Sequence, residues 1–417
     1  MKLFLKNIGK IEKATIDLNG ITVIAGENDT GKSTIGKALF AVFNSFYDIE
    51  SKIKMEREKS IENYIFANSN SNSINLSILR ENFIDTVINE LNSDNIHNID
   101  EKTIKKTIYN NIEENVDDET IELVDKTAKK VKEVFGISHL EFLKEILKNN
   151  LLTEFSYQIG NIFSNEDSEI TLTIKGRDIN IKIKDDKFFS VENDISLGTE
   201  VIYIDNPFII DDIDTIILSR LNRNISSKHS YFLRKKLESE YFLNTIIDKI
   251  IIQKSFEEIF NKIDLGNFVK FGPGIKYKKN NNEKALNVEN LSTGIKSFML
   301  IKTLLLNGHL SENGTIVLDE PEVHLHPEWQ LIFAELIVLL QKEFNMHILL
   351  TTHSPYFLNA IEVYSAKYEI KEKCKFYLSE NDGNFAKFND VTNNSELIYK
   401  KLARPFQELE NEGSRYE

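Results

Sequence analysis

The chain has 417 residues, enough for roughly two or three domain-sized units and a large hydrophobic core. Its 51 Lys and Arg residues against 65 Asp and Glu residues give a net charge of −14, so the overall field disfavours general adhesion to nucleic acid. Cys374 is the single cysteine, which excludes a disulfide framework and a cysteine zinc site.

The N-terminal residues lack the long apolar segment of a signal peptide. Lys302 interrupts the most apolar stretch, residues 298–306, so that stretch is too short to cross a membrane. Together with the cysteine count, these features lead us to expect a cytoplasmic protein without a membrane partner.

Residues 1–24 are predicted to form a β-ribbon and then a core strand over residues 21–24. The next residues fit the pattern G-x-x-x-x-G-K-[ST], with an apolar helix expected over residues 35–46. Such a loop directs backbone N–H groups and the positive end of a helix dipole at phosphate oxygens. We expect Lys32 to reach the β- and γ-phosphates of ATP and Ser33 to ligate Mg²⁺. The predicted nucleotide-binding residues are Gly26, Glu27, Asn28, Asp29, Thr30, Gly31, Lys32, Ser33 and Thr34.

Residues 47–199 differ in texture, being rich in Asn, Lys, Ile and Glu and free of proline. An apolar stripe at helical spacing predicts a helix that stops at Gly136. Ser138 and Glu141 form a capping-box pattern, which predicts another helix over residues 139–149. We interpret this segment as a mainly helical insertion, either a lid or an arm. The stripe consists of Ile121, Val124, Ala128, Val131 and Phe135.

Alternating apolar residues predict a β-hairpin near residues 170–184, and residues 201–204 read as a buried strand. In ATPases that resemble this chain, a polar residue that senses the γ-phosphate often follows such a strand, and the resemblance would give this role to Asn206. Helices are expected over residues 208–265, followed by three short strands within residues 268–288.

A Ser-Thr-Gly motif precedes the next predicted helix, which Gly308 is expected to end. Ser292 is a suitable N-cap for this helix. The exposed N–H groups of a helix start can bind an anion, and this start lies one helix upstream of an acidic strand. The motif is therefore a candidate second nucleotide contact through Ser292, Thr293 and Gly294, although it also fits a plain helix cap.

That acidic strand is a short apolar run, residues 315–318, which ends at Asp319 and Glu320. Burying two adjacent acids is costly unless a cation or a proton transfer uses them. We predict that Asp319 holds Mg²⁺, directly or through water, and that Glu320 polarises an attacking water. An acidic turn between a strand and a loop is the alternative interpretation.

A helix over residues 328–344 and a strand over residues 346–350 follow, and this strand leads into His353. If the two strands pair, His353 lies beside Glu320. Its imidazole could then hydrogen-bond the γ-phosphate and couple hydrolysis to movement.

These segments together resemble an ATPase of the ABC superfamily. The runs D-E-P-E-V-H-L-H-P and T-H-S-P narrow the resemblance to the soluble OLD-like and RecF/SMC-like branch, which includes AAA family ATPases of bacterial anti-phage systems such as Septu. The Walker A, signature, Walker B with D-loop, and H-switch motifs correspond in order to residues 26–34, 291–297, 316–327 and 351–355.

The resemblance implies an α/β fold: a P-loop NTPase with an ABC-type ATPase head, a mixed β-sheet core and a helical insertion or lid subdomain. The head would comprise residues 1–46 and 200–417, with residues 47–199 as the insertion. It also implies an ATP-dependent head-to-head dimer, in which Ser292 and Gly294 of one subunit close over ATP held by the other.

Related OLD nucleases carry a Toprim nuclease domain after the ATPase, but only 64 residues follow His353 here. The resemblance therefore implies that ATP hydrolysis regulates a separate effector, such as an HNH or Toprim nuclease or a toxin, in anti-phage defence. Two alternatives stay open: a RecF/SMC-like DNA repair or maintenance ATPase that binds duplex DNA, and, less favoured, the ATPase subunit of a membrane transporter.

Overall fold

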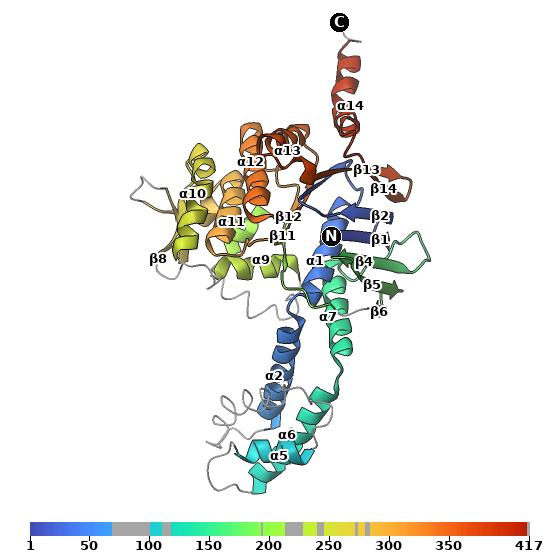
Figure 1. Ribbon diagram of the computed structural model, residues 1–417, viewed down its shortest axis with the longest axis vertical. Helices are drawn as coiled ribbons and strands as arrows, with labels where there is room; N and C mark the ends of the chain where they lie inside the picture. The colour runs from blue at the N-terminus through green and yellow to red at the C-terminus, as the bar shows by residue number, and fades with distance from the viewer. Residues whose placement is uncertain are drawn as a thin grey trace. The chain divides into compact units, whose positions relative to one another are not determined.

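The computed structural model describes residues 1–68, 101–110, 118–192, 195–212, 228–239, 246–271, 274–279 and 284–414 (Figure 1). The chain divides into two compact units. Unit 1 comprises Met1–Ser45, Leu147–Ile195 and Thr199–Glu417, and unit 2 comprises Phe46–Ile146 and Ser196–Gly198.

Unit 1 is built on a mixed sheet in the order β6-β5-β4-β1-β2-β14-β13-β3-β12-β11-β7. Its strands are β1 (Lys2–Ile8), β2 (Ile11–Asp17), β3 (Ile21–Gly26), β4 (Ser168–Ile174), β5 (Arg177–Lys184), β6 (Phe188–Glu192), β7 (Val201–Ile204), β11 (Thr315–Asp319), β12 (His347–Thr352), β13 (Cys374–Asp382) and β14 (Phe385–Asp390).

The strands from β13 to β7 run parallel, and β12 lies between β3 and β11. Asp319 is opposite Thr351, while Thr352 is opposite Ala25. The carboxyl ends of β3, β11 and β12 therefore meet at one edge of the sheet, which is where open α/β sheets bind ligands.

Burial follows the two kinds of strand pairing. Every residue of β3 and β7 is buried, as expected for parallel strands that are covered on both faces. In β4 and β5 buried positions alternate with more exposed ones, which fits antiparallel strands with one covered face. The predicted hairpin is confirmed, and it pairs with β1 through β4.

The helices of unit 1 contribute to a core that includes Phe298, Phe333, Leu336 and Phe357. They are α9 (His229–Glu238), α10 (Ile246–Lys262), α11 (Thr293–Leu306), α12 (Pro327–Phe344), α13 (Pro355–Lys367) and α14 (Glu396–Gly413), with short 3₁₀ turns η2 (Pro207–Asp212), η4 (Val288–Asn290) and η5 (Lys371–Lys373). α1 (Lys32–Phe46) is the next element after β3. The strands predicted within residues 268–288 form a separate small sheet of β8 (Asn267–Phe271), β9 (Gly274–Lys278) and β10 (Leu286–Asn287).

The residues after His353 extend the ATPase sheet. β13 pairs in parallel with β3, and β14 returns antiparallel to β13. From α14, Lys401 forms an ion pair with Glu27, with its Nζ 3.0 Å from Oε1. This C-terminal segment therefore supports the strand that leads into the predicted phosphate loop.

Unit 2 is helical, with α2 (Ile49–Asn68), α5 (Glu101–Asn110), α6 (Asp118–Gly136) and the first part of α7 (His139–Glu154). The predicted stop at Gly136 and the capping box are confirmed, because Ser138 N donates to Glu141 Oε2 at 3.0 Å. Val124, Ala128, Val131 and Phe135 pack in one core. The predicted stripe is wrong at its first member, since Ile121 is 41% exposed.

The boundaries of the two units differ from the division predicted from sequence. Residues 147–195, which the predicted division assigns to the insertion, lie in unit 1 because β4, β5 and β6 extend its sheet. The description of residues 47–199 as one insertion stays a prediction.

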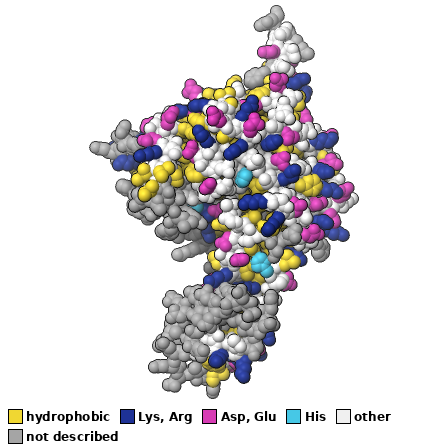
Figure 2. All heavy atoms as spheres, in the orientation of Figure 1, with side chains coloured by type: hydrophobic (Ala, Val, Ile, Leu, Met, Phe, Trp, Pro, Cys, Tyr) yellow, Lys and Arg dark blue, Asp and Glu magenta, His cyan; other side chains and the backbone are white. Residues whose placement is uncertain are grey.

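Among the described residues, none of the helices combines the length and apolar character that crossing a bilayer requires. Acidic and basic side chains are interspersed over the face of unit 1 in view (Figure 2). A mixed surface of this kind is ordinary for a protein of moderate net charge.

Candidate functional site

The phosphate-binding loop spans the gap between β3, which ends at Gly26, and α1, which begins at Lys32. A Cβ at Gly26 would lie 2.0 Å from the carbonyl oxygen of Ser379 in β13, so only glycine fits there. Gly31 adopts φ +77°, a conformation that glycine reaches without strain. Thr30 is buried and its hydroxyl lies 2.8 Å from the Ser379 hydroxyl, which fixes the loop against β13.

Lys32 is almost fully buried at the start of α1, and its ammonium donates to the Glu27 carbonyl oxygen at 2.6 Å. Burial lowers the pKa of Lys32, while the charges of Glu320, Asp319 and Glu322 oppose that shift. The loop thus places one ammonium within the field of three carboxylates, at a helix N-terminus suited to phosphate.

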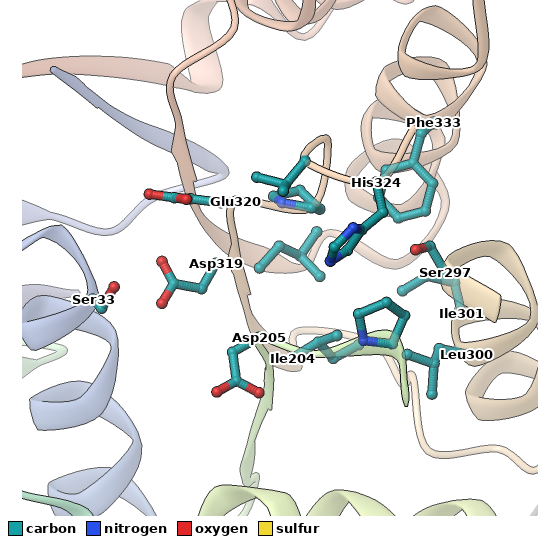
Figure 3. A pocket seen from close by; sticks show the side chains of 14 residues that line it. Ser33, Ile204, Asp205, Ser297, Leu300, Ile301, Asp319, Glu320, His324 and Phe333 are labelled. Atoms are coloured by element: carbon teal, nitrogen blue, oxygen red, sulfur yellow. The ribbon is translucent and has the colours of Figure 1, made fainter. Parts of the chain in front are cut away.

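Ser33 and Asp319 line one pocket of about 220 Å³ at the carboxyl edge of the sheet. The Asp319 carboxylate points toward the Ser33 side chain, and Asp205 lies below it, while Ser297 from α11 lies on the opposite wall (Figure 3). A hydroxyl and a carboxylate are the oxygen donors that Mg²⁺ prefers, so this donor set fits the predicted ion.

Two hydroxyl groups orient the Asp319 carboxylate. Thr351 donates to Oδ1 at 2.5 Å and Tyr203 donates to Oδ2 at 2.9 Å. Tyr203 is buried, and burial followed by the charge of Asp319 raises its pKa well above the ordinary range. Its hydroxyl therefore keeps its proton and acts as the donor.

Glu320 and His353 lie side by side, with Nε2 of His353 2.7 Å from Oε1 of Glu320. The neighbouring His353 imidazole lowers the pKa of Glu320, against the effect of partial burial. Glu320 adopts φ 49°, a left-handed conformation that is strained for a residue other than glycine. Its N–H donates to Thr351 Oγ1 at 2.9 Å, which helps hold that geometry.

Glu322 is buried, and its Oε1 accepts hydrogen bonds from Thr352 Oγ1 at 2.5 Å and from the His353 N–H at 2.9 Å. Burial raises the pKa of Glu322, against the effect of these hydrogen bonds. This carboxylate ties the segment after β11 to the segment after β12. The resemblance assigns Glu322 to the D-loop, and no local sequence pattern indicates this contact.

Ser292, Thr293 and Gly294 begin α11, where the Ser292 hydroxyl accepts from the Ile295 N–H at 3.5 Å as the predicted N-cap. Ser292 is exposed, whereas Gly294 is buried, and a Cβ on Gly294 would come within 3.0 Å of the Trp329 ring. None of the three lines the pocket formed by Ser33 and Asp319 in the described chain. Within one copy, the structure therefore does not bring this motif to the phosphate loop.

Asn206, the predicted γ-phosphate sensor after β7, does not line the pocket of Ser33 and Asp319 in the described chain, and its role stays a prediction. Asn206 Oδ1 accepts from the Phe208 N–H at 2.9 Å, so it caps the turn η2. Asp205 lines the pocket instead. Its position at the end of a buried strand was the available signal, as it was for Asp319.

The phosphate loop, the paired acids and the neighbouring histidine lie at the carboxyl ends of the parallel strands of a mixed sheet, which defines a P-loop ATPase of α/β class, as predicted. Residues 1–358 match the AAA ATPase domain family, so the chain belongs to that family. Membership in this family implies that the chain binds ATP.

Over 92 residues the chain is 34% identical to the retron Ec83 probable ATPase of Escherichia coli, an alignment that covers 19% of this chain and 16% of that protein. The chain thus spans only a small part of that relative.

Two solved structures are also similar. The SMC head domain from Thermotoga maritima has a TM-score of 0.40 and 12% identity, covering 94% of this chain and 98% of that chain. The Smc head domain from Pyrococcus furiosus, bound to the C-terminal domain of ScpA, has a TM-score of 0.43 and 13% identity, covering 97% of this chain and 98% of that chain.

Proposed function

We propose that this protein binds and hydrolyses ATP with Mg²⁺ at the edge of the sheet, and that ATP joins two copies head to head. The observation that carries the proposal is the alignment of β3, β12 and β11, which brings Lys32, Asp319, Glu320 and His353 together. These residues come from three separate parts of the chain, and each has a distinct task in phosphoryl transfer.

Lys32 and the N–H groups at the start of α1 bind the β- and γ-phosphates. Ser33 and Asp319 would hold Mg²⁺, which neutralises charge on the phosphates when bound. Glu320 accepts a proton from the attacking water. Because the neighbouring His353 imidazole keeps the pKa of Glu320 low, this carboxylate is ionised and able to accept a proton at neutral pH. His353 donates toward the γ-phosphate.

The proposed dimer gives a task to the start of α11, where Ser292 is exposed. Ser292 and the Gly294 N–H of one copy would contact the γ-phosphate bound by the other copy, since a helix N-terminus attracts anions. The nearby D-loop also exposes an apolar side chain, Val323, which is 59% accessible. Hydrolysis would remove the shared γ-phosphate and let the copies separate.

We further propose that the opening and closing of this dimer controls a separate effector, a nuclease or a toxin, in anti-phage defence. The D-E-P-E-V-H-L-H-P motif and the identity with the retron ATPase support this assignment. ATP-controlled assembly can regulate a partner protein, because only the dimer, and not the monomer, presents the complete partner-binding surface.

Sedimentation velocity tests the central step. The purified chain should sediment as a dimer with a non-hydrolysable ATP analogue and Mg²⁺, and as a monomer with ADP. A single sedimentation coefficient in all nucleotide states would reject the dimer mechanism. Affinity purification from the native host, with and without ATP, should recover the effector, and salt-dependent binding to bare duplex DNA would favour a DNA-maintenance function instead.

A further inference from the structure

Behind Asp319 lies a polar chain, buried except at Asp205, that the proposed mechanism does not use. The chain runs from Tyr203 through His229 to Glu154 and Asp205, and all four residues belong to unit 1. Tyr203, His229 and Glu154 are each buried. Because burying charged groups is costly unless each is paired, such a chain calls for an explanation.

His229 is held at both ring nitrogens. Its Nδ1 lies 2.5 Å from Glu154 Oε1, and its Nε2 lies 2.9 Å from Asp205 Oδ2. The other oxygen of Glu154 accepts the backbone N–H of His229 at 3.1 Å, at the first turn of α9. The imidazole therefore has little freedom to rotate.

The fixed imidazole packs on Tyr203, with ring centroids 4.4 Å apart and planes inclined by 32°. On another side Tyr203 faces Gly36 of α1, where a Cβ would come within 3.4 Å of its ring and 2.8 Å of Val317. The missing side chain at Gly36 lets α1 approach this closely. Tyr203 is thus confined between α1 and α9, with its hydroxyl directed to Asp319 Oδ2 at 2.9 Å.

We propose that Tyr203 is a positioning residue for Asp319, and that the Glu154–His229–Asp205 chain keeps Tyr203 in place. The inference rests on the proposed function, because it gives Asp319 the task of holding Mg²⁺. A partner that orients a metal-binding carboxylate typically changes metal affinity when it is removed, while leaving the ligand itself intact.

The test compares the full-length wild type with Tyr203→Phe, which removes only the hydroxyl. A fluorescent ATP analogue reports nucleotide affinity in EDTA and across a Mg²⁺ titration, and Mn²⁺ binding in the presence of ADP is read by EPR. We expect Tyr203→Phe to keep its affinity in EDTA but to need about tenfold more Mg²⁺, with weaker Mn²⁺ binding. Tyr377→Phe is the matched control, because Tyr377 is also buried in the sheet and its hydroxyl bonds only to the Asp17 N–H in the described contacts.

Each outcome decides a different point. A wild type whose nucleotide affinity ignores Mg²⁺ would reject the metal site and this inference with it. A Mg²⁺-dependent wild type with an identical Tyr203→Phe response would overturn the inference alone. Glu154→Gln should shift the Mg²⁺ requirement in the same direction, and a response equal to wild type would remove the part assigned to the buried chain.

Discussion

Replacing Glu320 with glutamine tests the assigned base with little change in shape. The Glu320 N–H would still bond Thr351 Oγ1 and the side chain would still reach His353 Nε2. The amide cannot take a proton from water. Loss of a general base typically slows turnover by about 10²–10⁴-fold, or roughly 3–5 kcal/mol in activation free energy.

In the same variant, the affinity for ATP should stay the same or rise, although turnover falls. The pKa of Glu320 is lowered by His353, so the wild-type side chain is anionic at neutral pH and repels the triphosphate. Glu320→Gln removes that repulsion and should bind ATP at least as tightly as the wild type. The variant should therefore accumulate as an ATP-bound dimer.

Single-turnover hydrolysis of γ-labelled ATP and equilibrium binding separate the two effects. Glu312→Gln is the matched control, because Glu312 is an exposed acid in the turn before β11. Wild-type turnover in Glu320→Gln would refute the role of Glu320 as base. Slow turnover combined with lost ATP binding would show that the carboxylate supports the site and not the proton transfer.

Three further variants probe other parts of the chain. Lys32→Ala should weaken ATP binding by roughly tenfold to a hundredfold, the value of a hydrogen bond to a charged group, and unchanged affinity by equilibrium dialysis would contradict its phosphate contact. Ser292→Arg should leave ATP binding by each copy intact but abolish dimerisation and ATPase activity, and full activity would exclude a shared site. Glu335 is buried, and although burial favours the neutral acid, hydrogen bonds from Lys262, Lys367 and Tyr368 hold its pKa at about 2 instead of 4.5. The stabilisation that the ionised Glu335 gives to the fold is therefore present above pH 4.5 and is lost as the pH falls toward 2. Glu335→Gln should lower the free energy of urea unfolding by up to about 3 kcal/mol at pH 7, and the difference from wild type should vanish near pH 2. A constant difference across that range would contradict the ion pairs.

The sequence was informative wherever a signal is local. The phosphate loop, the capping box at Ser138 and the hairpin near residues 170–184 each depend on neighbouring residues, and the structure has all three. Strand order depends on contacts between distant segments, which no local pattern encodes. No local pattern in the residues after His353 predicts that β13 pairs with β3.

The residues of the candidate site also fall into those that a local sequence pattern indicates and those that only the fold brings together. Asp319 and Glu320 stand out because acids after an apolar run are unusual, and His353 follows the next buried strand. Tyr203 gave no such signal, since a tyrosine inside the run V-I-Y-I reads as ordinary core. His229 and Glu154 come from other helices of the chain, so only the fold brings His229 against Tyr203 and Glu154 against His229.

The contacts of Glu322 suggest how hydrolysis and dimer opening could be coupled. This one buried carboxylate binds both Thr352 Oγ1 and the His353 N–H, while the residue after it, Val323, is exposed. In the proposed dimer, a movement of Val323 at the interface would reach His353 through Glu322 without crossing the sheet. His353 in turn contacts Glu320, so the orientation of the base would depend on whether the second copy is in place. Such a linkage would favour hydrolysis in the closed dimer, because only there would both strand ends hold the geometry that the reaction needs.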